Sequence, residues 1–331
     1  MRRLAAVFGE PASGPPVPGR RVLQLCLGLI WLLDAGLQFQ PYMFGPFFVT
    51  QTIELGAAGS PAPVAGSVNW AGHLMLQHIA VYNAIFAVIQ LIIACGLFFR
   101  GTVRLALAAS IAWSLCVWWF GESLGGIFTG ASPLAGFPGG VVLYALIAVL
   151  LWPTRSVEAG QAGQNSTAAS GILGARWANV PWILLWGSFS YFLLLPVNRD
   201  PDAIGQLFAN TDGEPGWLVS VMSALGGAAA HRGTVISVVL AVGCAVAAVG
   251  IALRPAVRLA CVLAIAVAVF AWLAEGLGGI FTGQGTDPNT GPLLVLLAAC
   301  YWPRNPVQDK AGDGVPMMPD GCPSTRLVTG S

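Results

Sequence analysis

The sequence predicts an all-α integral membrane protein in which eight transmembrane helices form two tandem, parallel four-helix repeats. Three observations support this prediction. Hydrophobic residues make up 56% and charged residues 9% of the 331 residues, whereas about a quarter of the residues of an ordinary soluble protein are charged. Apolar stretches long enough to cross a bilayer recur along the chain. One motif occurs twice, as GESLGGIFTG at 121–130 and EGLGGIFTG at 275–283.

Eight stretches of the chain are candidates for membrane spans. A helix needs about 20 mainly apolar residues to cross the hydrocarbon layer. The last stretch is short, and the DPNTGP sequence before it is expected to start that helix. The expected spans are 22–43, 76–99, 103–121, 135–152, 177–196, 233–253, 257–274 and 288–303.

Basic residues predict the orientation, because Lys and Arg near helix ends remain mostly on the cytoplasmic side. With eight spans, Arg199 and Arg232 fall on one side, and the other thirteen of the fifteen Lys and Arg residues fall on the opposite side. We therefore expect a multi-pass plasma-membrane protein with both termini in the cytoplasm. The N-terminal tail, 1–20, breaks into Gly and Pro before an apolar run and does not resemble a signal peptide.

The two halves of the chain align with each other beyond the glutamate and glycine motif. The alignment predicts a first repeat at 21–155, a polar linker at 156–175, a second repeat at 176–305 and a C-terminal tail at 306–331. Four spans is an even number, so both repeats enter the bilayer from the same side. The matching pairs are Trp31 with Trp186, Pro41 with Pro196, FFRGTVRLA (98–106) with ALRPAVRLA (252–260), and LLWPTR (150–155) with CYWPRN (300–305).

Asp34 is the most deeply placed acid of the predicted spans. It follows Arg21 by 13 residues, which is about 20 Å along a helix. An aspartate inside a span costs roughly 2.5–3.5 kcal/mol, so Asp34 must face protein or water. Gln38 lies one turn later on the same helix face. Their aligned residues are Phe189 and Leu193, so the predicted polar site is asymmetric.

Glu122 and Glu275 each end a helix that is expected to run outward. An acid there faces the negative end of the helix dipole, which costs about 0.3–1 kcal/mol, so some other group should compensate it. Two interpretations stay open. In one, each glutamate accepts hydrogen bonds from the amides of the IFTG turn and holds the loop in place. In the other, the two acids line a cavity between the repeats.

His78 and His231 occupy nearly equivalent positions in the two repeats. They are candidates for metal or axial haem ligands, and the alternative is that they bond backbone or lipid headgroups at the interface. No HExxH or CxxCH sequence is present, and the seven cysteines show no metal-binding spacing, so a buried role is expected for most of them.

Several functions are not supported by any sequence motif. The chain has no Walker loop, GxSxG motif or dinucleotide fingerprint, and no basic patch for nucleic acid. No nucleophile and base pair of a hydrolase is apparent. The sequence therefore favours a role other than catalysis.

The layout of each repeat, four helices with short loops, basic residues flanking the second turn and a polar residue in the first helix, resembles the DoxX-like membrane proteins. This resemblance implies a four-helix membrane unit and a role in quinone-dependent sulfur oxidation or an accessory role in redox chemistry. It supplies no catalytic residues.

The leading functional hypothesis is a protein that binds, and translocates, a small solute or ion at an outward-facing acidic site between the repeats. Asp34 and Gln38 would form its embedded part, and Glu122 and Glu275 its mouth. One alternative is a redox subunit that holds quinone or haem near His78 and His231. Another is a non-catalytic membrane assembly factor with a membrane protein partner. The lipid bilayer is a partner in all three, and the cofactor stays undetermined.

Overall fold

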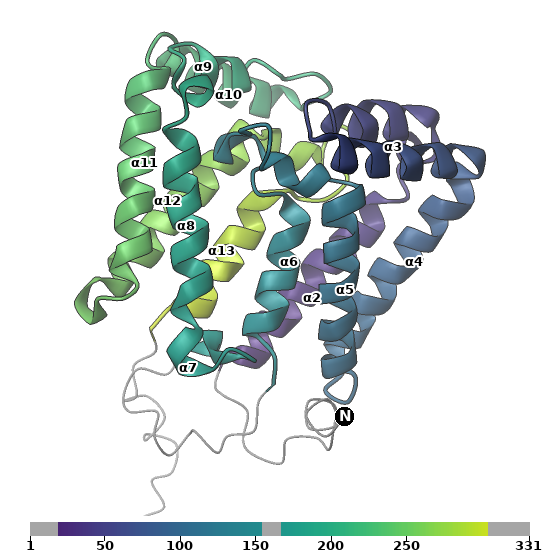
Figure 1. Cartoon of the computed structure of the whole chain (residues 1–331), viewed down its shortest axis with the longest axis horizontal. Helices are drawn as coiled ribbons and strands as arrows, with labels where there is room; N and C mark the ends of the chain where they lie inside the picture. The colour runs from purple at the N-terminus through teal and green to yellow at the C-terminus, as the bar shows by residue number, and fades with distance from the viewer. Residues whose placement is uncertain (1–18, 154–166, 304–331) are drawn as a thin grey trace, which may run out of the picture.

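The computed structural model describes residues 19–153 and 167–303, and these residues form helices and no strand. The prediction of an all-α fold is confirmed for them. The long helices run side by side in one bundle, and shorter helices lie across one end of it (Figure 1). Most of the predicted linker and tails lies outside the described residues.

The first half of the chain contributes α2, α4, α5 and α6 to the bundle. Short elements follow α2 and α5, and α3 lies across the end of the bundle (Figure 1). In order, the elements are α2 (Arg20–Leu37), η1 (Pro41–Phe44), the π-helix η2 (Phe48–Glu54), α3 (Ala62–Gln77), α4 (Ile79–Phe98), α5 (Val103–Phe120), η3 (Ser123–Gly126), η4 (Pro133–Ala135) and α6 (Gly140–Leu150).

The second half contributes α8, α11, α12 and α13, and its short helices α9 and α10 lie at the same end of the bundle as α3 (Figure 1). In order, the elements are η6 (Ala168–Ser170), α7 (Gly174–Trp177), α8 (Asn179–Leu193), η7 (Pro196–Arg199), α9 (Ala203–Leu207), α10 (Gly216–Ala229), α11 (Gly233–Gly250), η8 (Arg254–Ala256), α12 (Val257–Ala274), η9 (Gly276–Gly279) and α13 (Thr290–Tyr301).

Four helical runs in the described part of the chain are long and apolar enough to cross a membrane. They are Ile79–Phe98, Val103–Phe120, Gly233–Gly250 and Arg254–Ala274. Helices also lie in the other four predicted stretches, but they are shorter or more polar. α2 has 18 residues and carries two arginines and Asp34, whereas α8, α6 and α13 have 15, 11 and 12 residues.

Helix ends differ from the expected spans where glycine or proline intervenes. The predicted span 22–43 ends as a helix at Leu37, because Pro41 disfavours helical backbone before it and starts a separate 3₁₀ turn. The predicted span 135–152 begins only at Gly140, after Gly136 and Gly139 with φ of 93° and 100°. These left-handed glycines direct the chain into the bundle.

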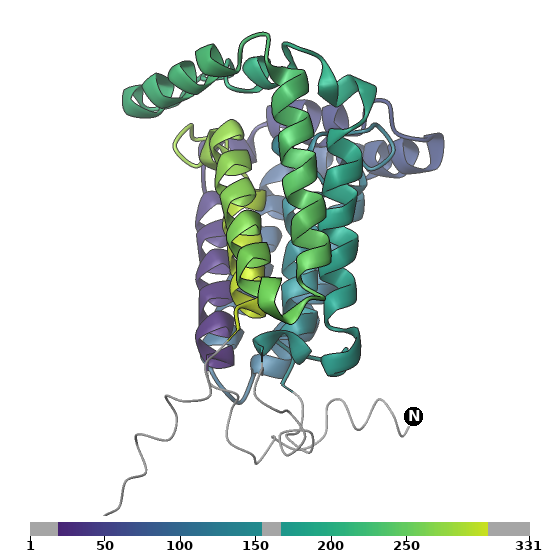
Figure 2. The same ribbon diagram turned by 90° about the vertical axis from the view of Figure 1, so that its left-hand side faces the viewer.

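Two helices, α3 and α10, were not among the predicted spans. Each begins just after a proline, Pro61 or Pro215, and each exposes a tryptophan, Trp70 or Trp217. Figure 2 shows α10 projecting beyond the bundle at one end. With 16 and 14 residues, both helices are too short to cross a bilayer, so a search for long apolar runs does not find them.

The core lies between the two halves. α6 packs against α13, and α13 also packs against α2. Helix pairs within each half complete the bundle: α2 with α4 and α5 with α6 in the first, α8 with α11 and α12 with α13 in the second. α2 begins and α13 ends at the same end of the bundle, opposite α3 and α10 (Figure 1).

Candidate acidic site between the two halves

Each repeated glutamate is followed by a turn of left-handed helix. Ser123, Leu124, Gly125 and Gly126 have φ of 50°, 61°, 61° and 71°, and the residues from Gly276 to Gly279 have φ of 54–74°. A left-handed backbone costs a non-glycine residue about 1–2 kcal/mol, and it normally occurs at single residues. Four in a row, found twice, show that the surrounding structure holds the turn in place.

The glycines of these turns pack directly against the loop that leads to the next helix. A Cβ at Gly125 would lie 1.8 Å from the carbonyl oxygen of Pro138, and one at Gly278 would lie 2.7 Å from the carbonyl carbon of Pro288. No side chain fits in this space. The doubled glycines therefore serve both the positive φ and a close approach of two backbones.

The two glutamates cap the helices that follow these loops. Both carboxylate oxygens of Glu122 accept from the amide of Val141, at 3.1 and 3.3 Å. Glu275 accepts from the hydroxyl of Thr290 at 2.8 Å, and backbone groups of Thr290 and Gly136 also face it. These groups belong to the starts of α6 and α13 and to the loop before α6, not to the IFTG turns. The positive ends of these helices offset the unfavourable position of each acid at the end of its own helix.

Both glutamates are half-buried residues, and Oε2 of Glu275 is fully buried without a hydrogen-bond partner. Burial raises the pKa of Glu275 to about 8, against the hydrogen bonds of Thr290, which lower it. Burial also raises the pKa of Glu122 well above its usual value, and the neighbouring charges of Asp287 and Glu275 add to this. The mutual repulsion shows that these acids lie in one electrostatic environment.

Asp34 is buried in the first half, with a side chain that is 2% exposed. Its Oδ2 accepts a hydrogen bond of 2.5 Å from the hydroxyl of Tyr144 on α6, and its Oδ1 has no hydrogen-bond partner. The Tyr144 ring lies 4.2 Å from that of Trp31, whose Nε1 donates to Ser110 Oγ at 3.1 Å. Asp34 is therefore held in a polar group built from three helices, α2, α5 and α6.

The second half also reaches this group, through Asp287 in the loop before α13. Asp287 is one of the charges that act on Asp34, Glu122 and Tyr144, and its Oδ1 would lie 3.1 Å from a Cβ at Gly140. Its own oxygens accept from Asn289 N at 2.6 Å and Thr286 Oγ1 at 3.0 Å. Burial raises the pKa of Asp287. The acidic site thus lies where the two halves meet.

Gln38 and Asn83 extend the site along α2 and α4. Gln38 is 5% and Asn83 0% exposed. Asn83 Nδ2 donates to the backbone oxygen of Gln38 at 2.7 Å, while Gln38 Oε1 and Asn83 Oδ1 have no hydrogen-bond partner. Together with Asp34 Oδ1, three buried acceptor oxygens of α2 and α4 have no donor.

The corresponding place in the second half is apolar. When the alignment of the halves is extended, Asp34 and Tyr144 of the first half align with Phe189 and Leu294 of the second. Asp287 of the second half aligns with Phe137 of the first. The Phe137 ring lies 6.0 Å from that of Phe189 and stacks on Phe192 at 4.0 Å. One junction between the halves is therefore acidic and the other aromatic.

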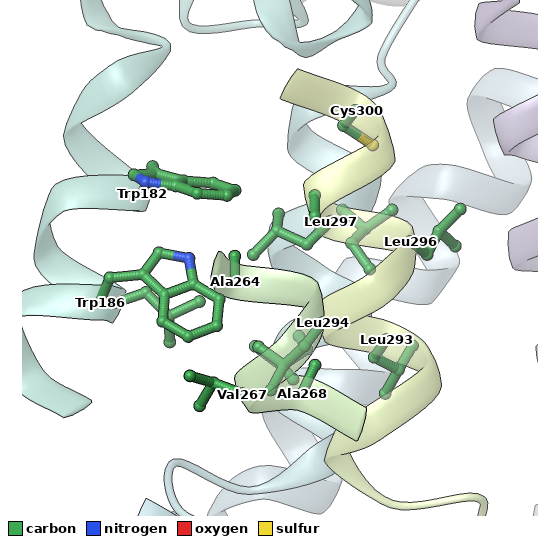
Figure 3. Packing of buried hydrophobic residues seen from close by; sticks show 14 of the residues in the cluster. Trp182, Trp186, Ala264, Val267, Ala268, Leu293, Leu294, Leu296, Leu297 and Cys300 are labelled. Carbon is green, nitrogen blue, oxygen red and sulfur yellow. The ribbon is translucent and has the colours of Figure 1, made fainter. Parts of the chain in front are cut away.

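The tryptophan at this second junction shows the same change. Trp186, which aligns with Trp31, is buried, and its Nε1 has no hydrogen-bond partner. Ala264 stands where the first half has Ser110. Figure 3 shows Trp186 and Ala264 among leucines and alanines of α12 and α13.

The two histidines are not brought together. His78 is exposed between α3 and α4, and His231 is exposed before α11, where its Nδ1 lies 2.8 Å from Asp202 Oδ1. α4 and α11 lie on opposite sides of the bundle (Figure 1). The two side chains therefore do not form a pair of axial ligands for one haem. Within the described residues, no group of three or more His, Cys, Asp or Glu side chains could hold a metal ion.

Sequence reasoning selected Asp34, Gln38, Glu122 and Glu275. The charge of Asp287 acts on all three of these acids, and Gln38 follows Asp34 by one turn on α2. Sequence reasoning missed Tyr144, Asn83 and Asp287, which lie far from Asp34 in sequence. One signal was present: Asp287 and Tyr144 each align with an apolar residue of the other half, as Asp34 does. Coupled polar and apolar differences between two repeats indicate side chains that meet in space.

No protein-family profile, curated protein or solved structure matches this chain.

Proposed function

We propose that this chain is a multi-pass plasma-membrane protein, composed of two parallel four-helix repeats, that binds and moves a small solute or ion. The binding site is the acidic junction of the two halves, which opens toward the outer side of the membrane. Asp34 is its embedded charge, Gln38 and Tyr144 line it, and Glu122 and Glu275 lie toward its mouth.

The duplication is supported by contacts that occur in reciprocal pairs. Gln40, after α2, lies beside Gly283, where a Cβ would be 3.9 Å from Gln40 Oε1. Its aligned residue Leu195, after α8, lies beside Gly130, where a Cβ would be 3.3 Å from Leu195 Cδ1. Each half thus contacts the last glycine of the motif in the other half. This exchange is the pattern of two units related by a pseudo-twofold axis.

The same equivalence holds for the short helices across the end of the bundle. A Cβ at Gly59, just before α3, would lie 3.5 Å from the methyl group of Thr129, and one at Gly213, before α10, would lie 3.3 Å from Thr282 Cβ. In each half, the segment that precedes α3 or α10 packs on the threonine of the IFTG turn. The two halves share more than their apolar spans.

Eight spans and cytoplasmic termini are proposed from the distribution of basic residues together with this bundle. α6 and α13 extend for only about 16–18 Å, so the loops before them carry polar backbone toward the depth of the membrane. Such backbone is tolerated there only when protein or water satisfies it. At these two helix starts, Glu122 accepts from the amide of Val141, Glu275 accepts from the hydroxyl of Thr290, and Asn289 accepts from the amide of Thr290.

The observation that carries the functional proposal is the one-sided acidic junction. An aspartate embedded in a span costs about 2.5–3.5 kcal/mol, and Phe189 shows that the fold accepts an apolar residue at the aligned position. Asp34 is nevertheless present, bonded to Tyr144 and close to Asp287. A charge that folding does not require marks a ligand or ion path.

The test is the Asp34→Asn variant, which keeps the shape of the side chain. Thermal unfolding of the purified protein is measured against a panel of chloride salts, small amines, amino acids and sugars, because a ligand that binds the folded state raises the unfolding temperature. Wild type is expected to respond to at least one compound, and Asp34→Asn to none. Asp200→Asn, at an exposed acid of the outer loop, is the matched control and keeps the response.

Two outcomes contradict this proposal. One is an Asp34→Asn protein that inserts normally and responds as wild type does. The other is a wild-type protein without any response that copurifies at a fixed ratio with a larger complex, which favours the assembly factor. The redox alternative remains a prediction from resemblance, and the absorption spectrum of the purified protein tests it.

A further inference from the structure

We infer that the occupant of the acidic junction is a single positive charge, either an alkali cation or a protonated primary amine, held by oxygens of Asp34, Gln38 and Asn83. This inference rests on the proposed function and specifies its ligand. The ligand class follows from the oxygen atoms of the site that have no hydrogen-bond donor.

The unsatisfied atoms of these three side chains are all acceptors. Asp34 Oδ1, Gln38 Oε1 and Asn83 Oδ1 are buried and lack hydrogen-bond partners. A buried polar atom without a partner costs about 1–3 kcal/mol, and such groups in folded proteins are normally satisfied. Three acceptors with no donor are satisfied at once by a cation.

The three side chains come from adjacent positions. Asp34 and Gln38 are four residues apart on α2, a spacing that places their Cβ atoms about 5–6 Å apart on one face, and the backbone oxygen of Asp34 accepts from the amide of Gln38 at 3.0 Å. Asn83 Nδ2 lies 2.7 Å from the backbone oxygen of Gln38. The Asn83 amide group is thereby held beside the end of α2.

The charge of the set favours one positive charge over two. Of the acids near the junction, only Asp34 has a carboxylate oxygen that is both free and joined to this set. Asp287 accepts from Asn289 and Thr286, and both oxygens of Glu122 accept from Val141. The set is thus one carboxylate and two neutral carbonyl oxygens. Calcium sites commonly use several carboxylates, whereas three acceptors match the three N–H donors of a primary ammonium group.

The second half of the chain lacks this set. The residues aligned with Asp34, Gln38 and Asn83 are Phe189, Leu193 and Ser237. Ser237 Oγ donates to the backbone oxygen of Asn198 in η7 at 2.7 Å, five residues beyond the one that aligns with Gln38. The second half therefore forms a different hydrogen bond at this place and omits the acceptors of the first half.

These aligned residues supply substitutions that the fold already accommodates. Gln38→Leu and Asn83→Ser copy the second half, and each removes one of the amide acceptors. Gln77→Leu, at an exposed amide where α3 ends, is the matched control. Unfolding temperatures are measured in sodium, potassium, ammonium and methylammonium chloride, with choline chloride at equal ionic strength as the reference.

A rise in unfolding temperature in one of the four salts over choline is expected for wild type and Gln77→Leu. The apparent affinity is expected to fall at least tenfold in Gln38→Leu and in Asn83→Ser, and the rise to vanish in Asp34→Asn. A response to sodium or potassium identifies a metal ion, and one to ammonium or methylammonium identifies an amine. Equal behaviour in all five salts, or full affinity in Gln38→Leu and Asn83→Ser, overturns the inference.

The two proposals fail in different ways. If wild type responds only to a neutral or divalent compound, and Asp34→Asn abolishes that response, the ligand class inferred here is wrong and the proposed function stands. If Asp34→Asn retains every response of wild type, the proposed function and the inferred ligand class are both wrong.

Discussion

At the scale of single residues, the halves differ in hydrogen bonds more than in shape. Trp31 and Trp186 are both buried at aligned positions, but only Trp31 has a partner for its indole N–H, Ser110. Asp34 and Tyr144 form a pair whose aligned residues, Phe189 and Leu294, are both apolar. Losing both members of a hydrogen-bonded pair leaves no buried group unsatisfied. The Asp34–Tyr144 pair therefore has no counterpart at the second junction, where Trp186 Nε1 remains without a partner.

The protonation of Glu275 makes a prediction about pH. Burial raises its pKa to about 8 in the folded protein, above the usual value near 4.3 of an exposed glutamate. The folded state then binds this proton more tightly, so the stability that the group contributes is complete below the unfolded pKa and is lost as pH rises through about 8. We expect wild type to lose stability between about pH 5 and pH 8.

Glu275→Gln should reduce this loss of stability with rising pH, since an amide does not titrate. The reduction is at most about 1.4 kcal/mol for each unit by which the folded and unfolded pKa values differ. Thermal unfolding at several pH values measures it. Asp212→Asn, at an exposed loop acid, should leave the pH profile unchanged. A profile in Glu275→Gln as steep as that of wild type contradicts the prediction. Part of the slope should remain, because burial also raises the pKa of Glu122 and Asp287.

The residues of the site were only partly predictable from the sequence. Asp34 and the two repeated glutamates stand out because ionisable groups are rare in apolar stretches. Their partners do not stand out. Tyr144 resembles an ordinary aromatic residue of a helix, and Asp287 resembles an ordinary acid in a loop. Only the packing of α6 and α13 against the rest of the bundle brings them to Asp34.

At the scale of elements, the left-handed turns are the least expected feature. The Gly-Gly pairs suggested helix ends, but a whole turn with positive φ includes Leu124 and Leu277, which have no intrinsic preference for it. The contacts of each turn with the loop at Pro138 or Pro288 explain its stability. Such contacts between distant segments are not apparent from local sequence.

Gly125→Ala should therefore be strongly destabilising. Its Cβ would lie 1.8 Å from a backbone oxygen, at a φ of 61°, so the loop must move in addition to the cost of about 1–2 kcal/mol for the left-handed backbone. Gly36→Ala is the matched control, since a Cβ there meets nothing within 4 Å in helix α2. The control should be neutral or stabilising by up to about 1 kcal/mol.

The measurement is unfolding of both variants in mixed detergent micelles. A Gly125→Ala protein as stable as Gly36→Ala would show that the loop at Pro138 can shift at little cost. The same substitution at Gly278, in the second turn, should behave as Gly125→Ala does, because its Cβ would lie 2.7 Å from the carbonyl carbon of Pro288.

Helices were predicted better than their ends. A helix occurs in each of the eight apolar stretches, because a long apolar run must satisfy its backbone internally. α6 begins at Gly140, five residues after the start of the predicted span 135–152. α13 begins at Thr290, close to the start of the predicted span 288–303. α3 and α10 escaped prediction because each is a short helix with small and polar residues among its apolar ones.

At the scale of the whole molecule, the proposed topology places the two ends of the bundle on opposite sides of the membrane. Gly101, in the turn between α4 and α5, and Asp212, before α10, are exposed, and α10 lies at the opposite end from this turn (Figure 1). In intact cells, a membrane-impermeant thiol reagent should label Asp212→Cys and not Gly101→Cys.

Gly101→Cys should be labelled only after the membrane is opened. Labelling is compared with that of the parent protein, whose native cysteines give the background. Labelling of both variants from outside, or of Gly101→Cys alone, contradicts the orientation taken from the basic residues.

The reciprocal contacts of Gln40 with Gly283 and of Leu195 with Gly130 have a consequence for the origin of the molecule. On the proposed duplication, each unit contacts the glycine motif of the other, as two identical subunits do in an isologous dimer. The proposal implies an ancestral unit that worked as a homodimer with two identical junctions. Fusion into one chain released the two copies from being the same, so that one junction could keep its acids while the other filled with phenylalanine.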